Sequence, residues 1–264
     1  MRRWLSLLLF PLLIAGCGED IEGCLDPQAT NFDPSADVSC CCEYPQLALK
    51  LSYKNYSTDS LSFVLNFPYD DDYGNVYMVN DLRFYLSDFE LVRPDNSVVT
   101  VTDALEVLLS NGDLTTLKDD FCIVRNSVFK YNIGTTNVSG DFTKIRFKVG
   151  LDSIASQVNP QDLETSHPLH ADFGMFANDN YTYNKIAIIA DTASAVVSTY
   201  NINSTVVEIE LNHDFTINSG FDTEIKVNAD LRGLLNTIDF QNDDYDTIIS
   251  KIIANTSGIF SIVE

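Results

Sequence analysis

Apolar residues recur at every second position through much of this 264-residue chain, and this period restricts the chain to folds built from half-buried strands. Successive side chains of a strand point to opposite faces, so alternation gives one face to a core and the other to water. The pattern predicts strands over 47–53, 61–67, 145–151 and 225–229.

The segment 82–91 departs from strict alternation. Its apolar residues change parity between Leu86 and Phe89, which predicts a β-bulge or a strand that passes from one sheet to another. Asp88 falls on the apolar side of this run, so we expect its carboxylate to accept hydrogen bonds from the backbone at the bulge. A further strand is expected at 98–101.

Helices are expected to be few and short. Capping signals and apolar spacing predict them near 103–110, 160–165, 230–237 and 245–254. The length of residues 47–264 suits one all-β domain, for which we predict an antiparallel β-sandwich with a few short helices.

The N-terminus has the layout of a bacterial lipoprotein signal. Arg2 and Arg3 precede a short apolar stretch, and the small pair Ala15-Gly16 stands directly before Cys17. Such a stretch is too short to span a hydrocarbon core of roughly 30 Å, so residues 1–16 are predicted to be a cleaved signal peptide. Lipidation of Cys17 would anchor the protein to the bacterial outer membrane, on its periplasmic face or at the cell surface. An ordinary secretory signal with an incidental cysteine is the alternative.

The mature chain is expected to be strongly acidic. Removal of residues 1–16 takes away two arginines and no acid, so the formal charge changes from −22 to −24. This charge repels nucleic acids and anionic membrane surfaces, and it argues against both as partners. The lipid on Cys17 is the expected membrane contact, since no other segment is long and apolar enough to cross a bilayer. The sequence names no protein or glycan partner.

Residues 17–46 are rich in Cys and Asp, and their turn-forming composition predicts a spacer between the anchor and the sandwich. In an oxidising compartment Cys24 is expected to pair with Cys40 or a neighbouring cysteine, which closes a loop of about 15 residues. Five cysteines follow Cys17, so one thiol is left over. A thiolate metal site is the alternative for the triplet 40–42, although the C-x-x-C spacing of zinc sites is absent.

The spacer also has a recognisable sequence pattern. From Gly23 to Cys40 it resembles a short Gly-Cys-x-Asp-Pro repeat, closed by Ser-Cys, of exported proteins of marine Bacteroidetes. One copy is present here, and Phe32 takes the aromatic position of the repeat.

After the spacer, five segments stand in an order that is typical of one family. They are 80–91, which contains Phe84-Tyr85-Leu86-Ser87-Asp88; 147–152; His167-Pro168-Leu169 with Gly174-Met175-Phe176; 211–213; and 253–260. In this order they resemble the MbnP-like family of exported, copper-linked β-sandwich proteins. The resemblance covers about residues 47–264 and implies a β-sandwich with copper as its cofactor.

The family's copper ligands are only partly present. In copper-binding members, a Trp oxidised to kynurenine and a His two residues later join a second His on the strand that matches 211–213. Here Ala177 and Asp179 stand at the first two positions, and the one Trp, Trp4, lies in the signal peptide. His213 alone keeps a ligand position, so the resemblance implies an incomplete copper site.

Three histidines and one methionine are therefore the candidate metal ligands. His213 shares the apolar face of its strand, so it is either a metal ligand or a partly buried histidine satisfied by one hydrogen bond. His167 and His170 lie in a Pro-containing loop close to Met175, and imidazole with thioether suits copper. A pair of exposed loop histidines is the alternative.

Acidic clusters offer calcium as a second candidate cofactor. They are Asp70-Asp71-Asp72 and the series Asp26, Asn31, Asp33 and Asp37. Neither has the spacing of an EF-hand loop, and in a chain this acidic the alternative is a set of solvated carboxylates.

Enzyme signatures are missing from the sequence. The chain has no nucleophile elbow, no phosphate-binding loop, no H-E-x-x-H and no dinucleotide fingerprint. A two-carboxylate glycosidase has no sequence spacing of its own and is the enzyme class left open. We predict a non-enzymatic, membrane-anchored, extracytoplasmic lipoprotein of MbnP-like type that handles copper through a degenerate site. A surface binding or structural lipoprotein that has lost the metal is the alternative.

Overall fold

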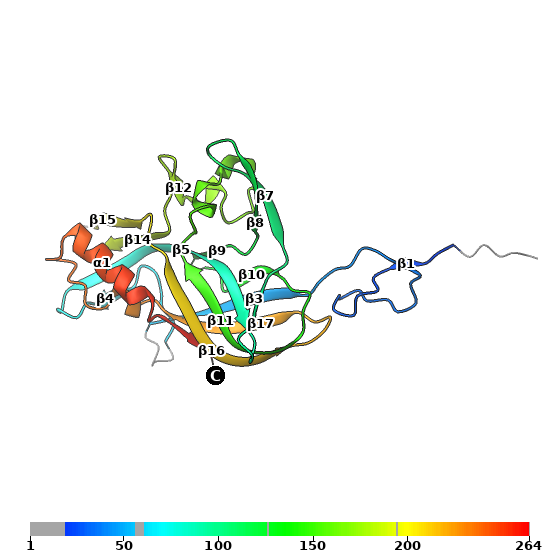
Figure 1. Ribbon diagram of the computed structural model, residues 1–264. Helices are drawn as coiled ribbons and strands as arrows, with labels where there is room; N and C mark the ends of the chain where they lie inside the picture. The colour runs from blue at the N-terminus through cyan, green and yellow to red at the C-terminus, as the bar shows by residue number, and fades with distance from the viewer. Residues whose placement is uncertain (1–18, 56–60, 126, 194, 264) are drawn as a thin grey trace, which may run out of the picture.

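A computed structural model describes residues 19–55, 61–125, 127–193 and 195–263. The predicted signal peptide and Cys17 lie outside the described residues. Two β-sheets form the body of the protein, and residues 19–45 extend from one end of it (Figure 1). The predicted antiparallel β-sandwich is confirmed, with one parallel pair, β3 with β17, within it.

The smaller sheet has four strands in the order β10-β3-β17-β18. Their bounds are β10 Lys130–Thr135, β3 Gln46–Lys54, β17 Thr223–Asp230 and β18 Phe260–Ile262. The larger sheet follows the path β15-β14-β5-β11-β16, and β4, β6 and β9 also pair with β5. Their bounds are β4 Pro68–Asp70, β5 Val76–Val92, β6 Val98–Thr100, β9 Cys122–Arg125, β11 Gly140–Val149, β14 Asn184–Ile189, β15 Val197–Ile202 and β16 Val207–Ile217.

The remaining elements are short. The strands are β1 Glu22–Gly23, β2 Val38–Ser39, β7 Ala104–Leu108, β8 Leu114–Lys118, β12 Phe176–Ala177 and β13 Asn180–Tyr181. The helices are the 3₁₀ turns η1 Ala155–Gln157, η2 Pro160–Asp162, η3 Ala171–Phe173 and η4 Gly233–Leu235, and the α-helix α1 Tyr245–Thr256. The Asp244 side chain caps α1 by accepting the Thr247 N–H at 2.8 Å. Within the described residues, no helix combines the length and apolar character that a membrane span requires.

Two predicted elements are wrong. The segment 103–110 is not a helix but contains β7, because Asn111-Gly112 turns the chain so that β8 pairs back on β7. The segment 61–67 makes one isolated bridge and no strand, and Asn66 adopts a left-handed φ of 58° that ends any extension. The predicted helices near 160–165 and 230–237 are only the 3₁₀ turns η2 and η4.

The predicted bulge is confirmed in β5. Lys148 of β11 pairs with Ser87 and Arg146 with Glu90, so two residues of β5 oppose one residue of β11. Asp88, at the bulge, has a φ of 54°. Its predicted role is wrong, because the backbone N–H groups of Asp88 and Phe89 donate to the carboxylate of Asp120, at 3.3 and 2.9 Å.

The carboxylate of Asp88 instead forms ion pairs with two lysines, Lys118 at 3.1 Å and Lys148 at 2.8 Å. Burial alone would raise the pKa of Asp88, but the hydrogen bonds from Lys148 and Lys118 hold it below its usual value. Asp120 is 1% exposed, and burial raises its pKa to about 6.

Two hydrophobic clusters lie on opposite faces of the larger sheet. The inter-sheet core lies between the two sheets and contains Phe89, Phe147 and Phe260, whose rings are in contact. We call the second cluster the cap, and it packs on the outer face of β5 and β9. Its buried residues are Tyr85, Val107, Leu117, Phe121, Ile123, Leu151, Ala155, Val158, Leu169, Met175, Tyr181 and Tyr183. The β7–β8 hairpin and the segment 151–183 supply most of them, and Figure 1 shows both above the sheets.

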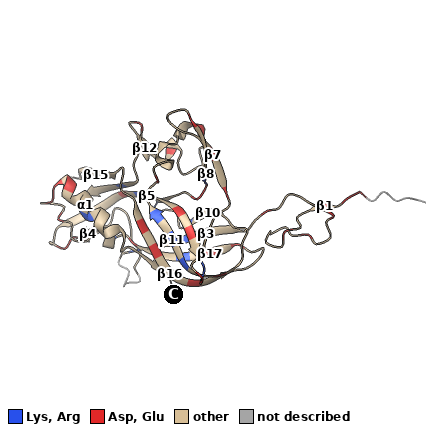
Figure 2. Cartoon of the chain, viewed as in Figure 1, with Lys and Arg blue, Asp and Glu red and all other residues tan. Residues whose placement is uncertain are grey.

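The outer face of the larger sheet beyond the cap is charged. Figure 2 shows basic residues on β11 beside acidic residues on β5 and β16. Glu210 of β16 accepts from Lys144 and Arg146 of β11, both at 2.7 Å. These hydrogen bonds, with the one from Lys144 as the larger cause and the one from Arg146 as the second, lower the pKa of Glu210. Because of these cross-strand ion pairs, negative and positive charges compensate each other on this part of an otherwise acidic surface.

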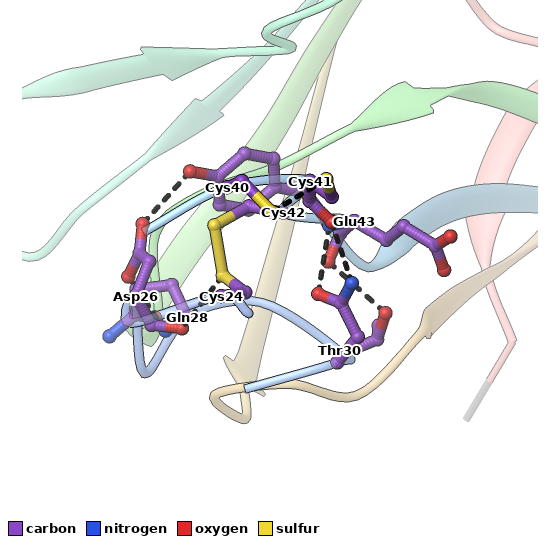
Figure 3. Close-up of a disulfide and its surroundings, with 10 residues drawn as sticks. Cys24, Asp26, Gln28, Thr30, Cys40, Cys41, Cys42 and Glu43 are labelled. Atoms are coloured by element: carbon purple, nitrogen blue, oxygen red, sulfur yellow. Dashed lines mark hydrogen bonds between the residues drawn. A yellow bond between two sulfur atoms is a disulfide. The ribbon is translucent and has the colours of Figure 1, made fainter. Parts of the chain in front are cut away.

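The spacer is a small disulfide-closed loop (Figure 3). Cys24 pairs with Cys42, not with Cys40, over a Cα–Cα distance of 4.9 Å. The parallel pairing of β1 and β2 places Cys40 beside Gly23, and a left-handed φ at Cys41 then bends the chain so that Cys42 meets Cys24. Three described cysteines are free thiols: Cys40, exposed Cys41 and buried Cys122.

Candidate functional site

His213 lies in the edge strand β16 of the larger sheet. The odd-numbered residues of β16 are the less exposed ones, so His213 is partly buried, and its ring stacks on Phe215 at 5.4 Å. The register shifts at this point, since Phe142 pairs with Phe215 but Lys144 with Asn212. His213 therefore sits at a bulge near the start of β11.

His167 and His170 lie in the cap, where His167 is half-buried and His170 is buried, so they are not a pair of exposed loop histidines. His167 accepts the Leu169 N–H at Nδ1, so its Nε2 carries the proton that it donates to Asp119, at 3.1 Å. His170 is buried and accepts the Asp172 N–H at Nδ1, which caps η3. Local structure uses at least one nitrogen of each ring.

Met175 and the two replaced ligand positions lie close together in the chain. The side chain of Met175 is buried in the cap. Ala177 pairs with Asn180, and Asn178 and Asp179 form the turn of the β12–β13 hairpin with left-handed φ values of 53° and 60°. Ala177 and Asp179 are exposed, so neither position points into a closed metal pocket.

The structure keeps His213 apart from the other candidate ligands. A chain of backbone hydrogen bonds connects Met175 to the end of β11. The Thr182 N–H donates to the Met175 carbonyl, the Tyr85 N–H donates to the carbonyl of the next residue, Tyr183, and the Gly150 N–H donates to the Tyr85 carbonyl. Met175 therefore lies near Gly150, at the C-terminal end of β11, whereas His213 lies opposite residue 143, near the start of β11. Seven strand residues separate these points, a distance of about 23 Å.

The donor set does not fit the family's copper centre. His213 has none of the other candidate ligands beside it. The rings of His167 and His170 are held within the cap by hydrogen bonds to neighbouring residues. In the described ranges, no three residues of the types His, Cys, Asp and Glu are grouped so that they could hold a metal ion.

Most of the carboxylates proposed for calcium accept hydrogen bonds from backbone or side-chain groups of the protein. Asp71 accepts the N–H groups of Tyr73 and Asn75, and Asp72 accepts that of Thr237. In the spacer, Asp26 accepts from Gln28 and Tyr44, while Asp33 accepts from Ser35. Members of both clusters therefore accept hydrogen bonds from the protein itself, within turns for Asp71 and Asp33 and from a distant segment for Asp72.

A cleft of about 770 Å³ opens between the cap and strands β9 and β10. Its lining comes from the segments 103–106, 119–125, 128–135 and 162–168, with Phe173. This volume lies within the 300–1,000 Å³ that is usual for small-molecule sites. Of the predicted site residues that the structure describes, His167 alone lines it.

Arg125, at the end of β9, is one of the two cationic residues that line this cleft. Its backbone N–H donates to the Tyr131 hydroxyl and its carbonyl accepts from the Tyr53 hydroxyl, both at 3.0 Å. The guanidinium carbon lies 5.1 Å from the centre of the Phe173 ring. No sequence pattern marks Arg125, Phe173 and Asp119 as site residues, because they come together only when the cap folds onto β9.

The sequence model of the MbnP family matches residues 46–252. The chain therefore belongs to the MbnP family, and the predicted resemblance is confirmed. A similar solved structure is MbnP from Methylosinus trichosporium, which is 13% identical, with 75% of this chain and 78% of that chain covered and a TM-score of 0.40. A search of curated proteins gives no match.

Proposed function

We propose that this MbnP-family protein is a non-enzymatic surface binding lipoprotein that has lost the family's copper centre. The observation that carries the proposal is the separation of His213 from His167, His170 and Met175, by about 23 Å along β11 for Met175. A transition-metal site needs several donors around one point, and single histidines do not supply them. Copper, if it binds, binds weakly through His213.

The proposed location is extracytoplasmic, with the lipid on Cys17 as the anchor. Supporting this, the spacer has a disulfide, which persists in oxidising compartments. It leads from the N-terminal side into β3 and so would link the anchor to the sandwich (Figure 1).

A copper titration of the full mature protein tests the loss of the metal. We expect weak or no binding, and no kynurenine absorbance, since the mature chain has no Trp. Any residual binding should disappear in His213→Ala and persist in the matched control His170→Ala. Tight, stoichiometric copper that survives His213→Ala would contradict the proposal and place a site elsewhere.

Membrane fractionation tests the anchor. Cys17→Ala should leave the protein unprocessed or released from membranes, because the lipid is the proposed membrane contact. If the Cys17→Ala protein were cleaved after Gly16 and still recovered in membranes, this result would contradict lipid anchoring at Cys17.

A further inference from the structure

The cleft beside the cap contains an arginine whose guanidinium has no oxygen partner among the described residues. Of the five arginines in the described ranges, Arg83, Arg93, Arg146 and Arg232 each donate to a carboxylate or carbonyl oxygen. Arg125 makes no such bond to a described residue, and its Nε is buried without a hydrogen-bond partner there. Its guanidinium is held over Phe173 and lines the cleft.

A buried donor that lacks an acceptor destabilises a fold unless a ligand or water supplies the acceptor. The Tyr53 and Tyr131 hydroxyls fix the Arg125 backbone, and the Phe173 ring supports the guanidinium plane. Arg125 is thus preorganised to donate to an acceptor that enters the cleft.

The charge of the cleft restricts that acceptor. Five carboxylates line the cleft, on Asp103, Glu106, Asp119, Asp162 and Glu164, against two cationic side chains, Arg125 and Lys130. An anionic ligand would face this excess of negative charge on a chain of formal charge −22. A purely cationic ligand would meet the carboxylates but leave Arg125 unpaired.

Neutral sugars satisfy both requirements, because each hydroxyl donates to a carboxylate and accepts from a guanidinium. We propose that the cleft is a binding site for a neutral saccharide, an assignment that rests on the proposed function of a surface binding protein. Arg125 donates to sugar oxygens, and the exposed carboxylates of Glu106 and Glu164 at the rim accept from hydroxyls. The side chains of Leu163 and Pro168 give the C–H faces of the sugar an apolar surface.

Saturation-transfer NMR on the full mature protein in detergent tests this assignment. The probes are five neutral trisaccharides: cellotriose, maltotriose, laminaritriose, mannotriose and N-acetylchitotriose. Trigalacturonate is an anionic probe of similar size, and triglycine is a smaller, zwitterionic probe. We expect one or more neutral trisaccharides to bind, trigalacturonate not to bind, and the affinity to change less than about twofold between 0.05 and 0.5 M NaCl, because a neutral ligand has no net charge to screen.

Variants then locate the site. Arg125→Ala should lower the affinity for the neutral saccharide by about tenfold or more, since the substitution removes a charge-assisted hydrogen-bond donor. Arg125→Lys should restore part of the affinity, because lysine keeps the charge and loses the planar fork. Arg146→Ala is the matched control, since Arg146 forms exposed ion pairs on β11 outside the cleft and its loss should leave binding unchanged. A thermal unfolding transition for each variant establishes that it is folded.

Three results would overturn the assignment: no binding of any neutral trisaccharide, preferred binding of trigalacturonate or triglycine, or unchanged affinity in a folded Arg125→Ala protein. These results concern the cleft alone. The proposed function fails separately, through tight copper binding that survives His213→Ala or through recovery of a cleaved Cys17→Ala protein in membranes.

Discussion

The inter-sheet core and the cap bury apolar side chains on opposite faces of the same sheet, but they are built differently. Strand residues of regular period supply most of the core, with Leu47, Leu49 and Leu51 of β3 as an example. The cap draws on a hairpin and on the segment 151–183, where three 3₁₀ turns and one two-stranded hairpin replace long strands. The core therefore joins the two sheets of the fold, while the irregular cap forms one side of the cleft.

Phe147→Ala should have the largest effect on stability. Phe147 is 1% exposed and its ring contacts Phe89 at 5.5 Å and Phe260 at 5.2 Å, so truncation leaves a cavity between the sheets. We expect a loss of about 3–5 kcal/mol in the free energy of unfolding, measured by urea denaturation. Phe147→Leu, the control, should lose much less. Equal losses in the two variants would show that cavity volume is not the cause.

The same contrast explains how far the sequence predicts the molecule. Period-two alternation predicts β3, β11 and β17, and the parity change predicts the bulge at Asp88, because these features follow from which face is buried. The helix predicted over 103–110 is wrong, since its capping signal is weaker than the Asn111-Gly112 hairpin signal that follows it.

The candidate site was less predictable than the fold. His213 has its partly buried position on the apolar face, as alternation predicts. Arg125 and Phe173 are 48 positions apart in the sequence and meet only through tertiary packing. Which cysteine pairs with Cys24 depends on the backbone bend at Cys41, which sequence spacing does not reveal.

Asp120 joins the core and the cap, because it accepts the Phe89 N–H and lies 3.8 Å from Lys118 of β8. Burial raises its pKa from 3.8 to about 6, so between these values the native state binds more protons than the unfolded chain. The contribution of Asp120 to stability is therefore fully present below about pH 4 and is lost as the pH rises through about 6.

Asp120→Asn removes this titration. The stability advantage of the wild type over Asp120→Asn should fall by roughly 3 kcal/mol between pH 4 and pH 7, as measured by denaturant unfolding across that range. Asp179→Asn, an exposed substitution in the β12–β13 turn, is the matched control. A difference that stays constant with pH would show that Asp120 does not titrate in this range.

Met175→Ala tests whether the cap unfolds on its own. Met175 is 1% exposed in the cap, so we expect a loss of about 2 kcal/mol, the low end for a buried Met, because irregular segments relax into the cavity. Hydrogen exchange should speed up most at Thr182, whose N–H donates to the Met175 carbonyl at 2.7 Å. Equal acceleration at core amides such as Val227 would mean that cap and core unfold as one unit.

Deletion of residues 18–44 should have the smallest effect, because both clusters lie almost entirely within 46–263. The Cys24–Cys42 bond closes a loop inside the deleted segment and does not constrain the unfolded sandwich. The deletion removes the hydrogen bond from the Ser219 hydroxyl to the Pro27 carbonyl and the packing of Ala29 against Gly220. Pro45 and Gln46 remain, and with them the Thr136 N–H bond to the Pro45 carbonyl and the Gln46 N–H bond to Asp222.

We therefore expect the deletion to change the free energy of unfolding by less than about 1 kcal/mol, as for other exposed terminal segments, and to leave one cooperative transition by calorimetry. The Cys24→Ser/Cys42→Ser double variant of the full chain separates the disulfide from the segment, and it too should leave the transition of the sandwich unchanged. If the deletion abolished cooperative unfolding, the spacer would be a third packing element of the domain, and the contrast between core and cap would be incomplete without it.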